Sequence, residues 1–198
     1  MNVAESWHEF LINVAYAKDY QVYFLVAGGV GGLPPKNPIL EQILPSLLFV
    51  KSLTILDAGL EEVLVARHVS LRAMGYRDDL NGRIKAAGDL GIIPDSELLH
   101  DARRARNDVA HEFSNISTWG ELETAISNIQ EALAAMGLVG PRPNYKVAGG
   151  KTRASAEELT DPKAIFGLKC HVSVLDEAGK EWGEIKWIVN IYGTGGRG

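Results

Sequence analysis

The sequence predicts a mainly α protein, with a helical bundle over residues 1–140 and a β-hairpin appendage near the C-terminus. Two observations support this division. Apolar residues recur at three- and four-residue steps through the first two thirds of the chain, which is typical of amphipathic helices. After residue 163 the apolar period changes to two, which is typical of half-buried strands.

The first half of the bundle should hold two main helices and short extra ones. One helix is expected over residues 5–26 and ends at the glycine-rich stretch 28–35. Asn37-Pro38 can start a short helix, and Pro45 is expected to break or kink it. The next long helix is predicted over residues 46–68, with a short helix over 79–87 after it. The predicted core residues of the long helix are Leu47, Val50, Leu53, Leu60 and Leu64.

The second half of the bundle should hold two more long helices. One is predicted over residues 94–113, because proline suits the first turn of a helix. Its buried stripe is expected to be Leu98, Ala102, Ala105, Val109 and Phe113, and its polar face His100, Arg103, Arg104, Asn107 and His111. The last helix begins at a capping box of Thr118 and Glu121 and ends at Gly137. Its helically spaced apolar residues are Leu122, Ile126, Ile129, Leu133 and Met136.

The C-terminal region is expected to be a linker followed by a hairpin. Prolines and glycines in residues 141–162 indicate the linker, and residues 163–198 hold the appendage and a flexible tail. The two predicted strands flank a turn at residues 176–179. A lone hairpin is marginally stable in water, so it should pack on the bundle or on another chain.

Composition excludes some classes of protein. The chain has 198 residues, which suits one full core plus an appendage, and its net charge of -5 argues against a strong nonspecific grip on nucleic acid. Cys170 is the single cysteine, so no internal disulfide framework is expected, and a reducing cytoplasm is compatible with that. The N-terminus lacks the pattern of a signal peptide, and charged residues interrupt the best candidate for a membrane span. We therefore expect a cytoplasmic protein.

One short motif stands out in the helix predicted over residues 94–113. Arg106 is followed directly by Asn107, and His111 lies five positions after the arginine. This arrangement resembles the signature of the HEPN superfamily, small helical bundles that include many RNA-cleaving toxins and phage-defence effectors. Segments 56–64, 81–84 and 99–112 also follow in the order usual for that family, so the resemblance covers about residues 40–138.

The resemblance implies a metal-independent endoribonuclease that acts as a homodimer and needs no cofactor. His111 would take the proton of the RNA 2′-hydroxyl, Arg106 would offset charge on the phosphorane, and Asn107 would orient the imidazole or the phosphate. Arg103 and Arg104 would contact RNA. An antitoxin or another regulatory protein would restrain a toxin of this kind.

Other interpretations of the same residues stay open. The domain can be a catalytically silent HEPN module that binds a nucleotide, RNA or protein, with Arg106 and Asp108 in ion pairs between helices and His111 in a packing or capping role. The spacing of Glu5 with His8, and of Glu97 with His100, matches that of di-iron bundles, but both pairs come too early in their helices for a metal site. Cys170 and His171 lie on a predicted strand, where a packed thiol is expected.

Overall fold

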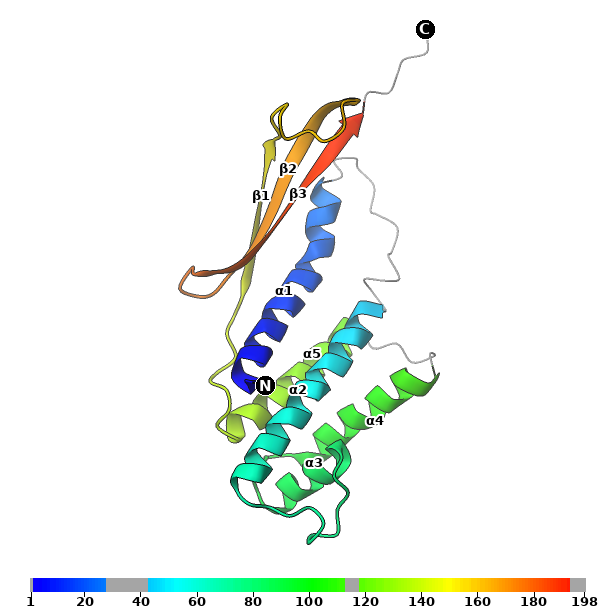
Figure 1. Ribbon diagram of the computed structural model, residues 1–198, viewed down its shortest axis with the longest axis vertical. Helices are drawn as coiled ribbons and strands as arrows, with labels where there is room; N and C mark the ends of the chain where they lie inside the picture. Colours follow the sequence, from blue (N-terminus) through cyan, green and yellow to red (C-terminus); the bar gives the residue numbers. More distant parts are fainter. Residues whose placement is uncertain (1, 28–42, 113–117, 193–198) are drawn as a thin grey trace. The chain divides into compact units, whose positions relative to one another are not determined.

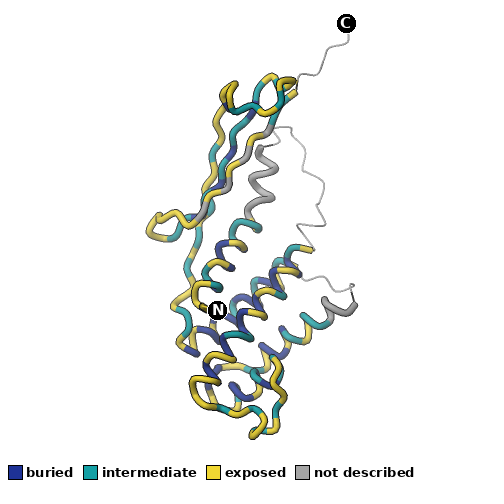
Figure 2. The backbone as a smooth tube through the Cα atoms, in the orientation of Figure 1, coloured by how far each residue is buried: buried dark blue, intermediate teal, exposed yellow. Residues whose placement is uncertain are grey.

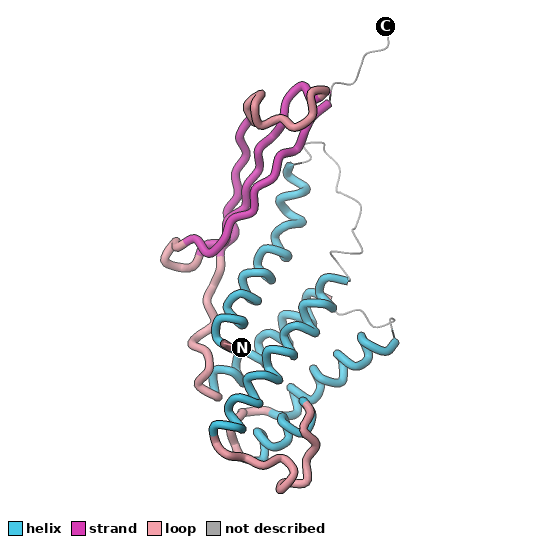
Figure 3. Tube along the Cα trace, in the orientation of Figure 1, coloured by secondary structure: helices cyan, strands magenta, loops and turns pink. Residues whose placement is uncertain are grey.

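The structure is a computed structural model that describes residues 2–27, 43–112 and 118–192, shown in Figure 1. Within these ranges, the side chains of residues 19–27, 108–112, 183, 185, 187 and 189 lie outside the description. The described chain forms five helices followed by three strands, in the order drawn in Figure 3. A mainly helical fold class with a C-terminal β element is therefore confirmed. The short helix expected after Asn37 lies outside the described residues.

The chain divides into two compact units, and each is described by itself. The first comprises residues 1–14 and 35–142, and the second comprises residues 15–34 and 143–198. Helix α1 (Val3–Ala27) contributes its first half to one unit and its second half to the other.

The first unit is a helical bundle in which α1 is joined by α2 (Leu44–Ala66), α3 (Leu80–Asp89), α4 (Ser96–Glu112) and α5 (Trp119–Ala135). Pro45 lies in the first turn of α2, where its missing N–H leaves no helical bond unmade. The predicted capping box is confirmed, because the Thr118 hydroxyl accepts from the Glu121 N–H and the Glu121 carboxylate accepts from the Thr118 N–H. Gly137 follows α5 with a φ of 76°, which confirms the predicted stop.

The buried residues of this unit are mostly apolar, and Figure 2 marks buried positions in dark blue along its helices. All five predicted core residues of α5 are buried, and so are Leu53, Leu60 and Leu64 of α2. Leu47 was expected in this core but is 62% exposed, so that prediction was wrong. The N-terminal half of α1 reaches α5 through Trp7, whose indole N–H donates to the Gln130 side-chain oxygen at 2.6 Å.

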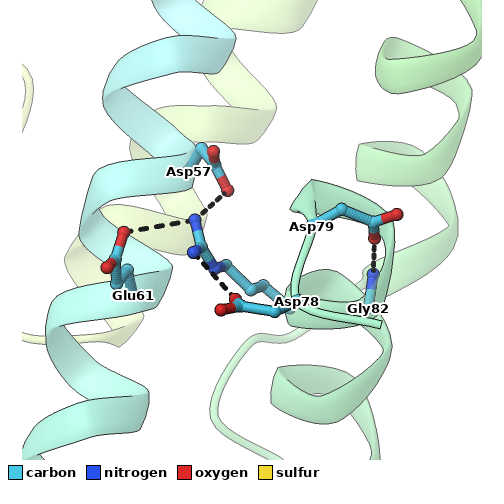
Figure 4. A network of polar contacts seen from close by, with 6 residues as sticks. Asp57, Glu61, Asp78, Asp79 and Gly82 are labelled. Atoms are coloured by element: carbon cyan, nitrogen blue, oxygen red, sulfur yellow. Dashed lines mark hydrogen bonds and ion pairs between the residues drawn. The ribbon is translucent and has the colours of Figure 1, made fainter. Parts of the chain in front are cut away.

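The start of α3 is held by two polar arrangements, which Figure 4 shows. Asp79 caps the helix by accepting from the Gly82 N–H at 2.8 Å. A Cβ at Gly82 would lie 1.9 Å from the Arg77 carbonyl oxygen, so this turn requires glycine. Arg83 reaches Asp57 and Glu61 of α2 at 2.8 and 3.2 Å, and Asp78 of the preceding loop at 2.9 Å. The Arg83 guanidinium therefore ties α3 to α2.

The buried stripe of α4 differs from the predicted one. Leu99 is 1% exposed, whereas Leu98 is 42% exposed and Ala105 is also exposed. Ala102 is buried as expected, while the side chains of Val109 and Phe113 lie outside the description. The sequence offers two adjacent leucines, and the contacts of α4 with α2, α3 and α5 select the second of them. Relative to the predicted stripe, the observed buried side of the helix is therefore rotated about the helix axis by one residue, or about 100°.

The described part of the second unit contains a three-stranded antiparallel sheet of order β1-β2-β3. Strands β2 (Ala164–Leu175) and β3 (Glu181–Tyr192) form the predicted hairpin, and the turn between them contains Gly179 with a φ of 78°. Strand β1 (Lys146–Arg153) lies inside the interval predicted as a linker, so the linker prediction was wrong there. Eight residue pairs join β1 to β2, and this pairing gives the hairpin support that two strands alone lack.

Candidate functional site

Helix α4 carries every residue of the HEPN-like motif. Its N-terminus is capped by Asp95, whose carboxylate accepts from the backbone N–H groups of Glu97 and Leu98 at 2.9 and 3.2 Å. The helix was predicted to begin at Pro94 and begins at Ser96. Because α4 contacts α2, α3 and α5, a rigid bundle sets the direction in which its side chains leave the helix.

Three predicted site residues share one half-buried side of α4. Arg103, Arg106 and Asn107 follow each other at steps of three and one, and all three are partly buried. The Nε atom of Arg103 is buried and has no hydrogen-bond partner among the described residues. Among the carboxylates whose side chains the structure describes, which leaves out Asp108 and Glu112, none forms an ion pair with Arg103 or Arg106. Two arginines without a counter-charge beside one amide can bind an anion such as a phosphate group.

Arg104 lies on the other side of the helix. Its guanidinium is half exposed and forms ion pairs with Glu97, at 2.7 Å, and with Asp101. The hydrogen bonds to Glu97 and then to Asp101 raise the pKa of Arg104. The sequence predicted the same role, contact with RNA, for Arg103 and Arg104, but the structure shows that their charges differ in compensation. The charge of Arg104 is compensated within its own helix, and the charge of Arg103 is not.

The position of His111 is known from the backbone alone. Helix α4 continues to Glu112, so residue 111 is helical, but its side chain lies outside the description. On a regular helix, position 111 falls on the same side as Asn107, four residues earlier, and about 140° from Arg106.

From the sequence, His100 was considered only with Glu97 as a possible di-iron pair, and it was not assigned to the RNA site. It was predicted on the polar face, yet it is 8% exposed, which is a consequence of the rotated stripe. Burial lowers the pKa of His100, and the nearby positive charges of Arg103 and Lys85 lower it further, against an opposing effect of Glu97. At neutral pH the imidazole is therefore uncharged and contributes no positive charge of its own.

The rival sites have little geometric support. In the ranges that the structure describes, no group of three or more His, Cys, Asp or Glu side chains is arranged to hold a metal ion.

Cys170 is buried and forms no disulfide, which confirms the prediction of a packed thiol. Among the described helices, none is long and apolar enough to cross a membrane.

Comparison with known proteins identifies no relative of this chain. No protein-family model matches the chain, and no significant match exists among curated proteins or solved structures.

Proposed function

We propose that this chain is a metal-independent endoribonuclease of the HEPN type, which acts as a toxin or a phage-defence effector. The observation that supports the proposal is that Arg106 and Asn107, consecutive residues of a bundle helix, are both half-buried, and that Arg106 has no counter-charge among the described side chains. A histidine position follows one turn later on the same helix. An arginine left unpaired at a partly desolvated position is well suited to a phosphate ligand.

The reaction follows from these groups. The His111 imidazole takes the proton of the 2′-hydroxyl, and the resulting oxyanion attacks the adjacent phosphorus. The Arg106 guanidinium offsets the negative charge that builds on the phosphorane oxygens. The bond from phosphorus to the 5′-oxygen then breaks, and this oxygen takes a proton from water while the His111 imidazolium returns its proton to the solvent, so the products are a 2′,3′-cyclic phosphate and a 5′-hydroxyl. Arg103 holds a neighbouring phosphate of the strand, and Arg104 contributes once RNA displaces one of its carboxylates.

The helix geometry favours a site shared by two chains. Positions 106 and 111 diverge by about 140°, so one helix cannot direct both side chains at one phosphate. Two copies of α4 related by a twofold axis bring the arginine of one chain close to the histidine of the other. Two sets of arginines also create a local positive field despite a net charge of -5 per chain.

The cleavage assay uses single-stranded RNA in EDTA. Wild-type protein should cleave it, and His111→Ala should lower the rate at least a hundredfold, because general-base catalysis contributes roughly that much. The matched control is His171→Ala, which removes a histidine from the sheet and should leave the rate unchanged. Cleavage by the His111 variant at the wild-type rate, in preparations freed of contaminating nuclease, would falsify the assignment. Toxicity on expression, relieved by the same substitution, gives a second readout.

The shared site also predicts a homodimer. Light scattering at micromolar concentration and moderate salt should give at least twice the chain mass of 21.5 kDa. Strict monomers that still cleave RNA would contradict the shared site.

A second candidate function is a catalytically silent domain that binds a nucleotide, RNA or protein. The acidic net charge and the internal compensation of Arg104 favour it. RNA binding by wild-type protein without cleavage, weakened by Arg103→Ala, would support this candidate instead.

A further inference from the structure

The two edges of the sheet differ in how well they are protected from further pairing. Strand β1 is 8 residues long, contains adjacent glycines at 149 and 150, and carries three basic residues. Short length and basic side chains are the usual devices that protect a sheet edge. Strand β3 is 12 residues long, has no proline, and pairs along one edge with β2, while its other edge has no strand partner within residues 2–27, 43–112 and 118–192. Among the described residues, no backbone hydrogen bond outside the β2 ladder involves β3.

The exposed side chains of β3 are self-complementary. Glu184, Lys186 and Ile188 occupy alternate positions, so they lie on one face, and all three are exposed. In an antiparallel pair of two β3 strands centred on Ile185, Glu184 of each copy lies opposite Lys186 of the other. The regular part of this register runs from residue 183 onward, because Val174 pairs with Gly183 and Leu175 with Glu181, which leaves Trp182 at an irregularity of the strand. The large apolar side chains of β3 that are described as exposed are Trp182 and Ile188, each at 38%, and Tyr192, at 54%.

The Trp182 side chain, at the start of β3, already has contacts within a single chain that fix its position. The indole N–H of Trp182 donates to Asp176 at 2.8 Å, and the Lys180 ammonium lies 3.9 Å from the ring centroid. Lys186 and Glu184 also form an ion pair within the strand at 2.6 Å. Side chains that are fixed before association lose little entropy when a partner arrives.

We propose that β3 is an association edge that pairs with β3 of a second copy of this chain, antiparallel and about a twofold axis at Ile185. The result is a continuous six-stranded sheet in which the free backbone groups of both edges are hydrogen-bonded. The charges favour a second copy of this chain as the partner, because in this register Glu184 of each copy lies opposite Lys186 of the other. The proposal does not rest on RNA cleavage.

Charge reversal tests this register directly. Glu184→Lys places two lysines of one chain opposite two of the other, and Lys186→Glu does the same with glutamates. In each variant alone the β3 contact should form on the order of thirtyfold more weakly than in wild type, because two attractive cross-strand pairs become repulsive. An equimolar mixture of the two variants restores opposite charges at both pairs and should form the β3 contact between unlike chains with near wild-type affinity. Sedimentation equilibrium of the full chain measures all three.

The outcomes separate this interface from other contacts. Rescue in the mixture cannot come from the ion pair within one strand, since neither variant regains it. The β3 contact is separate from the α4 contact proposed above, so its loss is measured as a fall in mass relative to wild type. A wild type and two single variants that all have the mass of a dimer would show the α4 contact alone and would overturn the β3 interface. A monomeric wild type would also overturn it and leave the edge for an extended strand of a different protein. A mixture no larger than either single variant would exclude the register.

Discussion

Trp7→Ala should lower the free energy of unfolding by about 4–5 kcal/mol, a large part of the stability of a typical domain. Trp7 is 2% exposed and stacks on Phe10 with ring centroids 5.1 Å apart. Its removal leaves a cavity between α1 and α5. It also deprives the Gln130 side-chain oxygen of its donor, while the Gln130 amide still donates to the Gly140 carbonyl at 2.8 Å. Urea unfolding followed by circular dichroism measures the loss.

The Trp7→Phe variant divides this effect into two parts. Phenylalanine keeps most of the buried ring but has no N–H, so the loss should fall to about 1–3 kcal/mol. Trp182→Ala is the matched control, since that indole is 38% exposed and lies in the sheet. A Trp7→Ala protein as stable as the Trp182→Ala protein would show that α1 does not contribute to the core through this residue.

Arg83→Met should lower the free energy of unfolding by about 3 kcal/mol. The Arg83 side chain is only 13% exposed, and it contacts three carboxylates. Burial disfavours its charged form, but the hydrogen bond and charge of Asp57 outweigh burial and raise the pKa of Arg83. Methionine removes the cation and leaves the carboxylates of Asp57, Glu61 and Asp78 to repel one another. Thermal and urea unfolding of the variant measure the effect.

Arg104→Met is the matched control for Arg83→Met. Arg104 also binds two carboxylates, but its side chain is 51% exposed, and exposed ion pairs contribute little to stability. We expect no measurable change for it. Equal losses for the two variants would contradict the role given to burial.

Local sequence patterns predict the parts of this fold that local interactions determine. Helix α5 is the best case, since its capping box, its core residues and the glycine after it are all encoded within about twenty residues. The hairpin turn at 176–179 is encoded in the same way. Strand β1 could not be found like this, because Lys146–Arg153 is polar and contains two glycines. Its strand conformation comes from backbone pairing with β2, and the paired residues lie between 15 positions apart, for Arg153 and Leu168, and 29 positions apart, for Lys146 and Leu175.

The candidate site shows the same limit. The sequence placed Arg103, Arg106 and Asn107 on one helix, and α4 does contain them. It could not distinguish Leu98 from Leu99 as the buried residue, because both satisfy helical spacing and only the neighbouring helices choose between them. The burial of His100 and the compensation of Arg104 follow from that choice. The Arg83 cluster joins residues from α2, a loop and α3, and no local pattern predicts such a combination.

The bond between Trp7 and Gln130 has a consequence for the order of folding. It links residues 123 positions apart, so the N-terminal part of α1 cannot reach its final place until α5 has been synthesised. Closing so large a loop carries an entropic penalty, and contacts of this separation slow folding. While the ribosome makes the intervening residues, Trp7, Phe10 and Leu11 expose apolar surface without their partners. The nascent chain is therefore most prone to aggregation before α5 emerges, and its first helix is among the last to be buried.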